Sequence, residues 1–283
     1  MNQRTAGIVH ATLLTTDIAA ASTAYVEQLG MQHGRREHLS DADAACLDLS
    51  DLALHPVQWL VNADGLEILR LIEDPAAAPA QPMFHHGWMS LEVLVGDIDA
   101  LAARLRTPFE VLGAPANLDF SDAIRAAQVL GPCGELLYLT QVKAPVPPFD
   151  LPLTDAEVAF SFIGVIATPS RDASHAAWKT LAGASGWSME TRITVLNRAH
   201  GKPMEDRYSI AVVPMPGQCM VEIDQVELTD AAPTKRRAGL HSLALRLPEI
   251  APDKLIQAGW LAIDANGHSW RGIAGEHVEL LPG

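Results

Sequence analysis

The chain has 283 residues, 48% of them hydrophobic, and a formal net charge of −14 at pH 7. This length and hydrophobic content are typical of a globular protein with one large domain or two ordinary ones. The acidic balance argues against nucleic acid or an anionic membrane as a partner, because both attract basic surfaces. No apolar run approaches the ~18 residues that a membrane-spanning helix needs.

The cysteines and the first residues bear on the compartment. Cys46, Cys133 and Cys219 are few, widely spaced and odd in number, which fits neither a disulfide framework nor a thiolate zinc site. The first residues lack the basic and apolar segments of a signal peptide. We therefore expect a protein of the reducing cytoplasm.

Four segments of the chain begin in a similar way, at a period of roughly 70–80 residues. The first opens with Gly7-Ile-Val-His-Ala-Thr-Leu-Leu, and its pattern predicts strands at 8–15, 32–38, 57–61 and 66–72. A helix is expected from Asp17, a capping residue, to residue 29, with Gly30 as its stop. The pattern of residues 40–54 is too irregular to interpret.

The other three segments repeat this order of strand, helix and three strands. The second predicts strands at 88–95, 109–112, 124–130 and 135–142 with a helix at 97–105; the third predicts strands at 159–167, 188–196, 208–213 and 220–226 with a helix at 171–181; the fourth predicts strands at 240–247, 260–263, 269–272 and 277–281 with a helix at 252–258. The pattern indicates an α+β fold with mixed sheets.

A proline-rich stretch at residues 144–153 divides the chain near its midpoint, because such a stretch stays extended and cannot join a helix or a central strand. We predict an N-terminal pair of modules at 1–143 (about 7–73 and 86–142). A C-terminal pair follows at 154–283 (about 159–227 and 238–283).

The repeated βαβββ unit, with a histidine on its first strand and a glutamate on its last, resembles the vicinal oxygen chelate superfamily. That group includes glyoxalase I, methylmalonyl-CoA epimerase, extradiol dioxygenases, and bleomycin and fosfomycin resistance proteins. The segments that carry the resemblance are Ile8-Val-His-Ala-Thr-Leu-Leu-Thr-Thr-Asp17, Gly131-Pro-Cys-Gly-Glu-Leu-Leu-Tyr138 and Ala274-Gly-Glu-His-Val-Glu279. It implies four modules in two cup-shaped mixed β-sheet barrels flanked by helices, and four modules are typical of the extradiol enzymes.

The resemblance also implies a metal site. Imidazole and carboxylate groups bind borderline divalent metals and leave positions open for substrate. The expected ligands are His10, His241 and Glu279, with Glu67 as a fourth, and the expected metal is Fe(II), with Mn(II), Zn(II) or Ni(II) as alternatives. Strand alternation places His277 on the face of Glu279, so it is a substitute ligand.

The pairing of modules stays open. If modules one and four face each other, His10, His241 and Glu279 form a triad of two histidines and one carboxylate. If neighbouring modules pair, neither half holds a complete set. At the matching inner positions the second module has Ser90 and Tyr138, and the third has Ile163 and Glu222.

The function implied by the resemblance is a metal-dependent enzyme acting on a small molecule, with extradiol cleavage of an aromatic diol placed first. His268 is a candidate proton-transfer group, and the Tyr138 hydroxyl could hold a substrate oxygen. A glyoxalase- or epimerase-type lyase or isomerase that includes Glu67 is the alternative. A non-catalytic binding protein is the third hypothesis, and a homo-oligomer is open.

Overall fold

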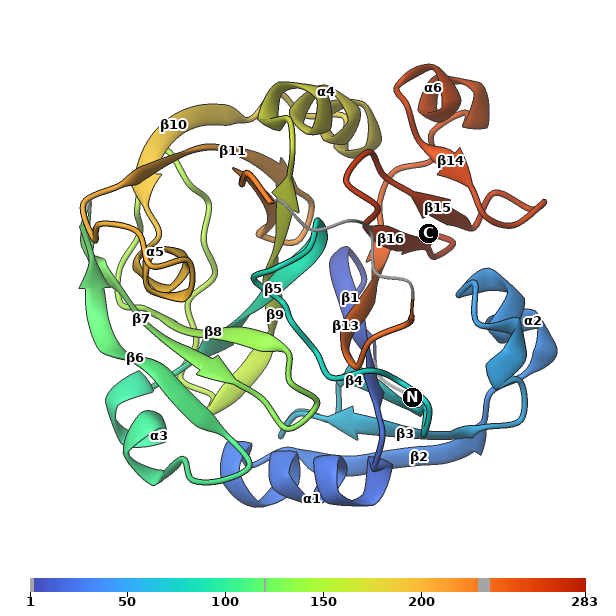
Figure 1. The fold of residues 1–283 in the computed structure, drawn as a ribbon, viewed down its shortest axis with the longest axis horizontal. Coiled ribbons are helices and arrows are strands. Elements are labelled where there is room, and N and C mark those ends of the chain that lie inside the picture. Colours follow the sequence, from blue (N-terminus) through green and yellow to red (C-terminus); the bar gives the residue numbers. More distant parts are fainter. Residues whose placement is uncertain (1–2, 120, 229–234) are drawn as a thin grey trace.

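The computed structural model describes residues 3–119, 121–228 and 235–283. Two eight-stranded sheets, each curved into a cup, lie back to back and open toward opposite sides (Figure 1). The α+β fold of four repeated modules is confirmed. Among the described residues no helix is long and apolar enough to cross a membrane.

Modules one and four form one sheet, with the strand order β14-β15-β16-β13-β1-β4-β3-β2. We call it the outer cup, because it joins the outer modules of the sequence. Its elements are β1 (Gly7–Thr15), α1 (Ile18–Leu29), β2 (Gln32–His38), α2 (Asp41–Cys46), a 3-10 helix η1 (Ser50–Leu52), β3 (Pro56–Val61), β4 (Glu67–Glu73), β13 (Gly239–Arg246), α6 (Pro252–Gln257), β14 (Leu261–Ala262), β15 (Ser269–Arg271) and β16 (His277–Leu280).

Modules two and three form the second sheet, the inner cup, in the order β10-β11-β12-β9-β5-β8-β7-β6. Each sheet thus joins strands from both sides of the proline-rich stretch, which decides the pairing that the sequence left open. The elements are β5 (Gly87–Val95), α3 (Ile98–Arg104), β6 (Glu110–Leu118), β7 (Ser121–Leu130), β8 (Leu136–Val142), β9 (Val158–Thr168), α4 (Arg171–Ala182), β10 (Trp187–Arg192), α5 (Thr194–Ala199), β11 (Arg207–Met215) and β12 (Cys219–Gln225).

The helix after each opening strand begins where the sequence predicts. The Asp17 carboxylate accepts a hydrogen bond from the backbone N–H of Ala20, and Gly30 ends α1 with a φ of 67°. Asp97 and Ser170 cap α3 and α4 in the same way. A side-chain oxygen at this position satisfies an N–H that the helix itself leaves free.

The strand expected at 109–112 extends to Leu118 in β6, and two other segments contain helices that the sequence did not predict. The strand expected at 188–196 ends at Arg192, and the helix α5 begins at Thr194. The uninterpreted segment 40–54 contains α2 and η1, with Ser40 as the cap of α2. The helices α2 and α5 lie at the open side of a cup, α2 on the outer one and α5 on the inner one (Figure 1). Their surroundings therefore differ from those of the helices that follow each opening strand.

The segment around α2 fills the mouth of the outer cup with apolar side chains. A separate hydrophobic cluster joins Ala44, Leu47, Leu49 and Leu52 to inward-facing residues of the sheet, including Trp59. We call residues 41–52 the apolar plug. The chain itself therefore covers this part of the outer cup.

Candidate functional site

The strand register of the outer cup relates its two halves by an approximate two-fold symmetry. In the antiparallel pair of β1 and β13, His10 lies opposite Ala244 and Thr12 lies opposite Ser242. The parallel neighbours continue the relation, because Arg70 pairs with Thr12 and Glu279 pairs with Ala244. Residues in register share one face of a sheet.

This register changes two of the expected equivalences. The position that matches Glu279 in module one is Arg70, and Glu67 lies three residues before it. The position that matches His10 in module four is Ser242, and His241 lies in a register shift of the β1–β13 pair. The residue opposite His10 is Ala244, which lies three residues beyond His241. His10 and His241 are therefore offset by roughly 10 Å along the strand direction.

Arg70 occupies the centre of the outer cup together with Glu279. Its Nη2 lies 2.6 and 2.7 Å from the two carboxylate oxygens, and its Nε and Nη2 also donate to Thr12 Oγ1. The Ser242 hydroxyl donates to Glu279 at 2.7 Å. Burial alone would raise the pKa of Glu279, but the charge of Arg70 overrides this and lowers the pKa to about 2.

His10 is buried beside this pair with 3% of its surface exposed. Neither ring nitrogen has a hydrogen-bond partner among the described residues, and the ring contacts Trp59 edge-on at 4.7 Å between centroids. Burial, and then the charge of Arg70, lowers the pKa of His10 to about 3. His10 is therefore a neutral ring at physiological pH.

His241 and His277 lie together, with ring centroids 5.3 Å apart. The ring of His241 bonds the Leu47 carbonyl of the apolar plug at 2.9 Å, and that of His277 bonds the Ser269 hydroxyl at 2.6 Å. Burial and the neighbouring His277 ring lower the pKa of His241 to about 4. Both rings thus hold contacts within the closed cup.

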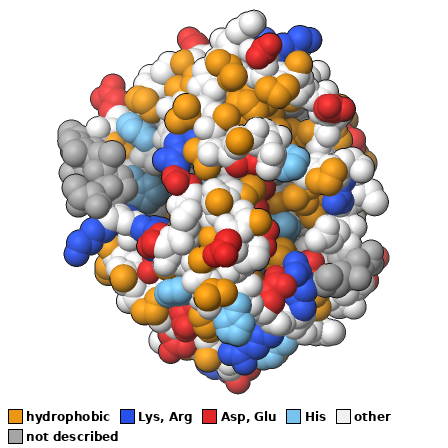
Figure 2. Space-filling model, turned by 90° about the vertical axis from the view of Figure 1, so that its right-hand side faces the viewer, with side chains coloured by type: hydrophobic (Ala, Val, Ile, Leu, Met, Phe, Trp, Pro, Cys, Tyr) orange, Lys and Arg blue, Asp and Glu red, His pale blue; other side chains and the backbone are white. Residues whose placement is uncertain are grey.

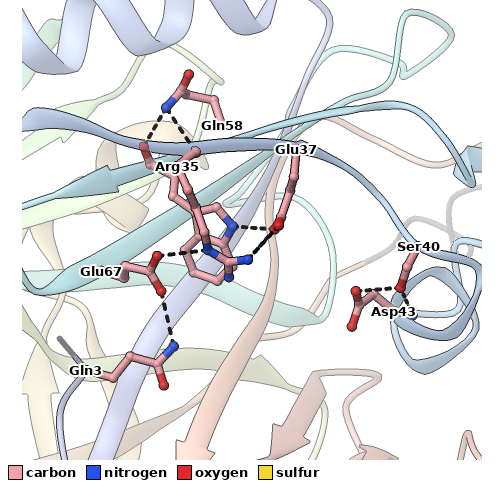
Figure 3. Close-up of polar contacts among 8 residues, drawn as sticks. Gln3, Arg35, Glu37, Ser40, Asp43, Gln58 and Glu67 are labelled. Atoms are coloured by element: carbon pink, nitrogen blue, oxygen red, sulfur yellow. Dashed lines mark hydrogen bonds and ion pairs between the residues drawn. The ribbon is translucent and has the colours of Figure 1, made fainter. Parts of the chain in front are cut away.

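Glu67 is bound at both carboxylate oxygens. Arg35 Nε donates to Oε1 at 2.9 Å and Gln3 Nε2 donates to Oε2 at 3.1 Å. Arg35 lies between Glu67 and Glu37 (Figure 3), and its guanidinium stacks over Trp59 at 4.3 Å.

On the side of the molecule in Figure 2, acidic, basic, histidine and hydrophobic side chains are interspersed.

The residues of the outer cup do not fit a divalent metal. Among the described residues no group of three or more His, Cys, Asp or Glu side chains is placed to hold a metal ion. The guanidinium of Arg70 already binds both oxygens of Glu279, and a second cation there would meet its positive charge. The metal roles of His10, His241, Glu279 and Glu67 stay a prediction.

His268 lies on the exposed turn between β14 and β15, where its backbone N–H donates to Asp264. The other residue with a predicted catalytic role, Tyr138, lines a cavity of about 410 Å³ in the inner cup. Tyr138 holds the register position that Arg70 holds in the outer cup, since it pairs with Glu92 as Arg70 pairs with Thr12.

The inner cavity contains two carboxylates on its sheet wall, Glu92 from β5 and Glu222 from β12. Glu222 pairs with Val165, which lies opposite Ser90. In the outer cup Glu279 pairs with Ala244, which lies opposite His10, so Glu222 is the inner counterpart of Glu279. Apolar side chains make up much of the remaining wall, including Phe162, Ile163, Ile210, Val212, Met220 and Val195. The helix α5 lies at the open side of the cavity (Figure 1).

No arginine, lysine or histidine forms an ion pair with these carboxylates in the described part of the chain, which distinguishes this cavity from the outer cup. Burial, and then the charge of Glu222, raises the pKa of Glu92 to about 8. Burial raises the pKa of Glu222 to about 7. Asp224 adjoins Glu222, and burial followed by the charge of Glu222 raises its pKa.

Two further contacts orient the groups at the cavity. The Thr140 hydroxyl donates to Glu92 Oε2 at 3.0 Å. Burial, and then the negative groups Asp224 and Glu222, raises the pKa of Tyr138 well above its ordinary value, so its hydroxyl keeps its proton. Perturbed carboxyls that share a cavity are typical of acid–base sites.

Glu92 was not among the predicted site residues. It is the one charged residue of the apolar segment Gly87-Trp-Met-Ser-Leu-Glu-Val-Leu, and a charge within a buried strand is a signal that could have identified it.

Comparison with known proteins gives a likeness in structure alone. No family model matches the chain, and no curated protein matches its sequence. Glyoxalase I from Zea mays is similar over 98% of this chain and 92% of its own, with a TM-score of 0.63 and 12% identity. A proposed dioxygenase from Bacillus subtilis is similar over 99% and 86%, with a TM-score of 0.64 and 10% identity. The chain therefore has the fold of the vicinal oxygen chelate proteins.

Proposed function

We propose that the chain is an enzyme that moves a proton within a small organic molecule bound in the inner cup, an isomerase or lyase type of reaction. The observation that carries the proposal is the pair Glu92 and Glu222, which line one cavity of about 410 Å³ and have pKa values raised to about 8 and about 7. A cavity of this volume accommodates a small metabolite.

Coupled carboxyls with pKa values near neutrality can act as acid and base at once. When one of the pair is ionised, it can take a proton from a carbon next to a carbonyl group, and the protonated partner can donate to another atom of the substrate. One proton enters the pair as one leaves, so the pair keeps a single proton, which passes back from one carboxyl to the other before the next turnover in the same direction. The Tyr138 hydroxyl would donate to the substrate oxygen on which negative charge develops.

The ring-cleaving dioxygenase, which the sequence placed first, depends on a metal held by His10, His241 and Glu279. The bond from Arg70 to Glu279 counts against it, whereas Glu92 and Glu222 line a cavity and form no ion pair with a basic side chain among the described residues. Oxygen uptake with a panel of catechols and hydroquinones tests the dioxygenase directly, and we expect none above background.

Deuterium exchange tests the proposal whatever product the reaction forms. The purified protein is incubated in D2O with a panel of 2-hydroxy aldehydes, 2-hydroxy ketones and acyl thioesters, and label at carbon is followed by NMR. We expect exchange in at least one member, reduced about 10²–10⁴-fold in Glu92→Gln and in Glu222→Gln. Glu67→Gln is the matched control, because Glu67 lies in the outer cup.

The pH dependence sharpens the test. Since one carboxyl must be ionised and the other protonated, the exchange rate should follow a bell with limbs near pH 7 and pH 8. Exchange that survives both substitutions would refute the proposal, as would oxygen uptake that Glu279→Gln abolishes.

A further inference from the structure

Arg70 in module one and Glu279 in module four hold matching register positions in the two halves of the outer cup. One half therefore has a positive charge where the other half has a carboxylate. Arg70 pairs with Thr12 on β4, and Glu279 pairs with Ala244 on β16. The two-fold relation of the sheet brings these side chains together at its centre, between module one and module four. Their exposed fractions are each 6%.

The guanidinium and one hydroxyl group satisfy the carboxylate. Both oxygens of Glu279 lie within 2.7 Å of Arg70 Nη2, and Ser242 donates to one of them. Thr12 accepts from two nitrogens of the same guanidinium. A buried carboxylate needs a compensating charge and hydrogen-bond donors, and a planar arginine supplies both.

The pair is buried, and apolar side chains pack beside it on the same face of the sheet. The His10 ring contacts the Trp59 ring edge-on, and the Arg70 guanidinium lies 5.5 Å from the Trp59 ring. The apolar plug packs against the same face through Leu47 and Leu49. Nothing in this arrangement calls for a further cation.

We propose that Arg70 takes the place of a metal ion in the outer cup, so that this sheet joins modules one and four without any divalent metal. The cation that neutralises Glu279 is a side chain of the chain itself. Such a cup is a structural unit, and chelators and added metals should leave it unchanged. This inference concerns the outer cup and does not depend on the activity proposed for the inner one.

Metal binding by wild-type protein and two variants tests it. Protein stripped with EDTA is dialysed against Co(II), then Zn(II), and bound metal is measured by elemental analysis and by Co(II) absorption. We expect no stoichiometric metal in the wild type, and the same melting temperature with EDTA as with Zn(II). In Arg70→Glu a second carboxylate faces Glu279 beside His10, so we expect a stoichiometric gain of Co(II) that an added His10→Ala removes.

Arg36→Glu is the control, because it makes the same change of charge on an exposed residue of β2. Stoichiometric metal in the wild type that Glu279→Gln removes would overturn the proposal. A folded Arg70→Glu protein that gains no more metal than Arg36→Glu would also overturn it, because Arg70 would not be what excludes the ion. If Arg70→Glu does not fold, the wild-type dialysis and its Glu279→Gln variant decide alone.

Discussion

Glu279 in the outer cup and Glu222 in the inner cup stand at the same register position of two similar sheets, and their environments push their pKa values in opposite directions. Arg70 lowers the pKa of Glu279 to about 2. Glu222 faces Tyr138 at the position of Arg70, and burial raises its pKa to about 7. One cup therefore holds a fixed charge and the other holds exchangeable protons.

The difference comes from very few positions. Arginine or tyrosine on the last strand of a module decides whether the carboxylate opposite is neutralised. Thr12 or Glu92 on the first strand decides whether a second acid is present. The mouth adds a third difference, since the apolar plug fills the outer cup and α5 leaves a cavity in the inner one. A repeated fold can thus separate a structural unit from a reactive one.

The largest expected effect is on the outer ion pair. Arg70→Met leaves Glu279 buried without its partner, which should lower the free energy of unfolding by about 3–5 kcal/mol in urea titrations. The double variant Arg70→Met with Glu279→Leu removes both charges and should recover most of that loss. If the double variant is as unstable as the single one, the pair does not compensate as described. Arg36→Met is the control for loss of a surface arginine.

His10 should limit stability in acid. A histidine whose folded pKa is lowered contributes stability that is present above its unfolded pKa of 6.5 and is lost as the pH falls toward about 3. His10→Leu loses no hydrogen bond and cannot take up a proton, so it should be near neutral at pH 7. At pH 4 it should be more stable than the wild type by roughly 2–3 kcal/mol. Equal losses at both pH values would contradict the neutral, unbonded ring.

The inner cup should respond to pH with the opposite sign. A glutamate whose folded pKa is raised contributes stability that is fully present below 4.5 and is lost as the pH rises through about 7 for Glu222 and about 8 for Glu92. Two buried glutamates outside the inner cavity, Glu135 and Glu276, have pKa values raised to about 7 and add to the same decline in the whole protein. We expect Glu92→Gln to exceed the wild type by roughly 2 kcal/mol at pH 8.5, with a smaller difference at pH 5. A constant difference across this range would count against a raised pKa.

The smallest effect belongs to the Glu67 network. Arg35 is one-third exposed and keeps its ion pair with Glu37 when Glu67 becomes glutamine. We expect Glu67→Gln to change the free energy of unfolding by no more than about 1 kcal/mol in urea titrations. A loss comparable to that of Arg70→Met would mean that the two arginines of the outer cup act as one unit.

Residue patterns predicted the fold well, because each module repeats an apolar strand, a capped helix such as Asp17–Gly30 and further strands. The site depended on register, which a single sequence does not reveal. The sequence comparison matched His241 with His10 and Glu67 with Glu279. The strand register, with its shift in the β1–β13 pair, instead matches Ser242 with His10 and Arg70 with Glu279. The pairing of distant modules, not local propensity, decides which side chains meet.

The most direct measurement of the contrast between the cups is a carboxyl titration by ¹³C NMR, with glutamate labelled and signals assigned from Glu92→Gln, Glu222→Gln and Glu279→Gln. We predict that Glu222 and Glu92 titrate near pH 7 and 8 and shift each other's titration, while Glu279 stays ionised down to about pH 2. Ordinary titration of all three near pH 4.5 would contradict the division into a charged cup and a proton-exchanging cup.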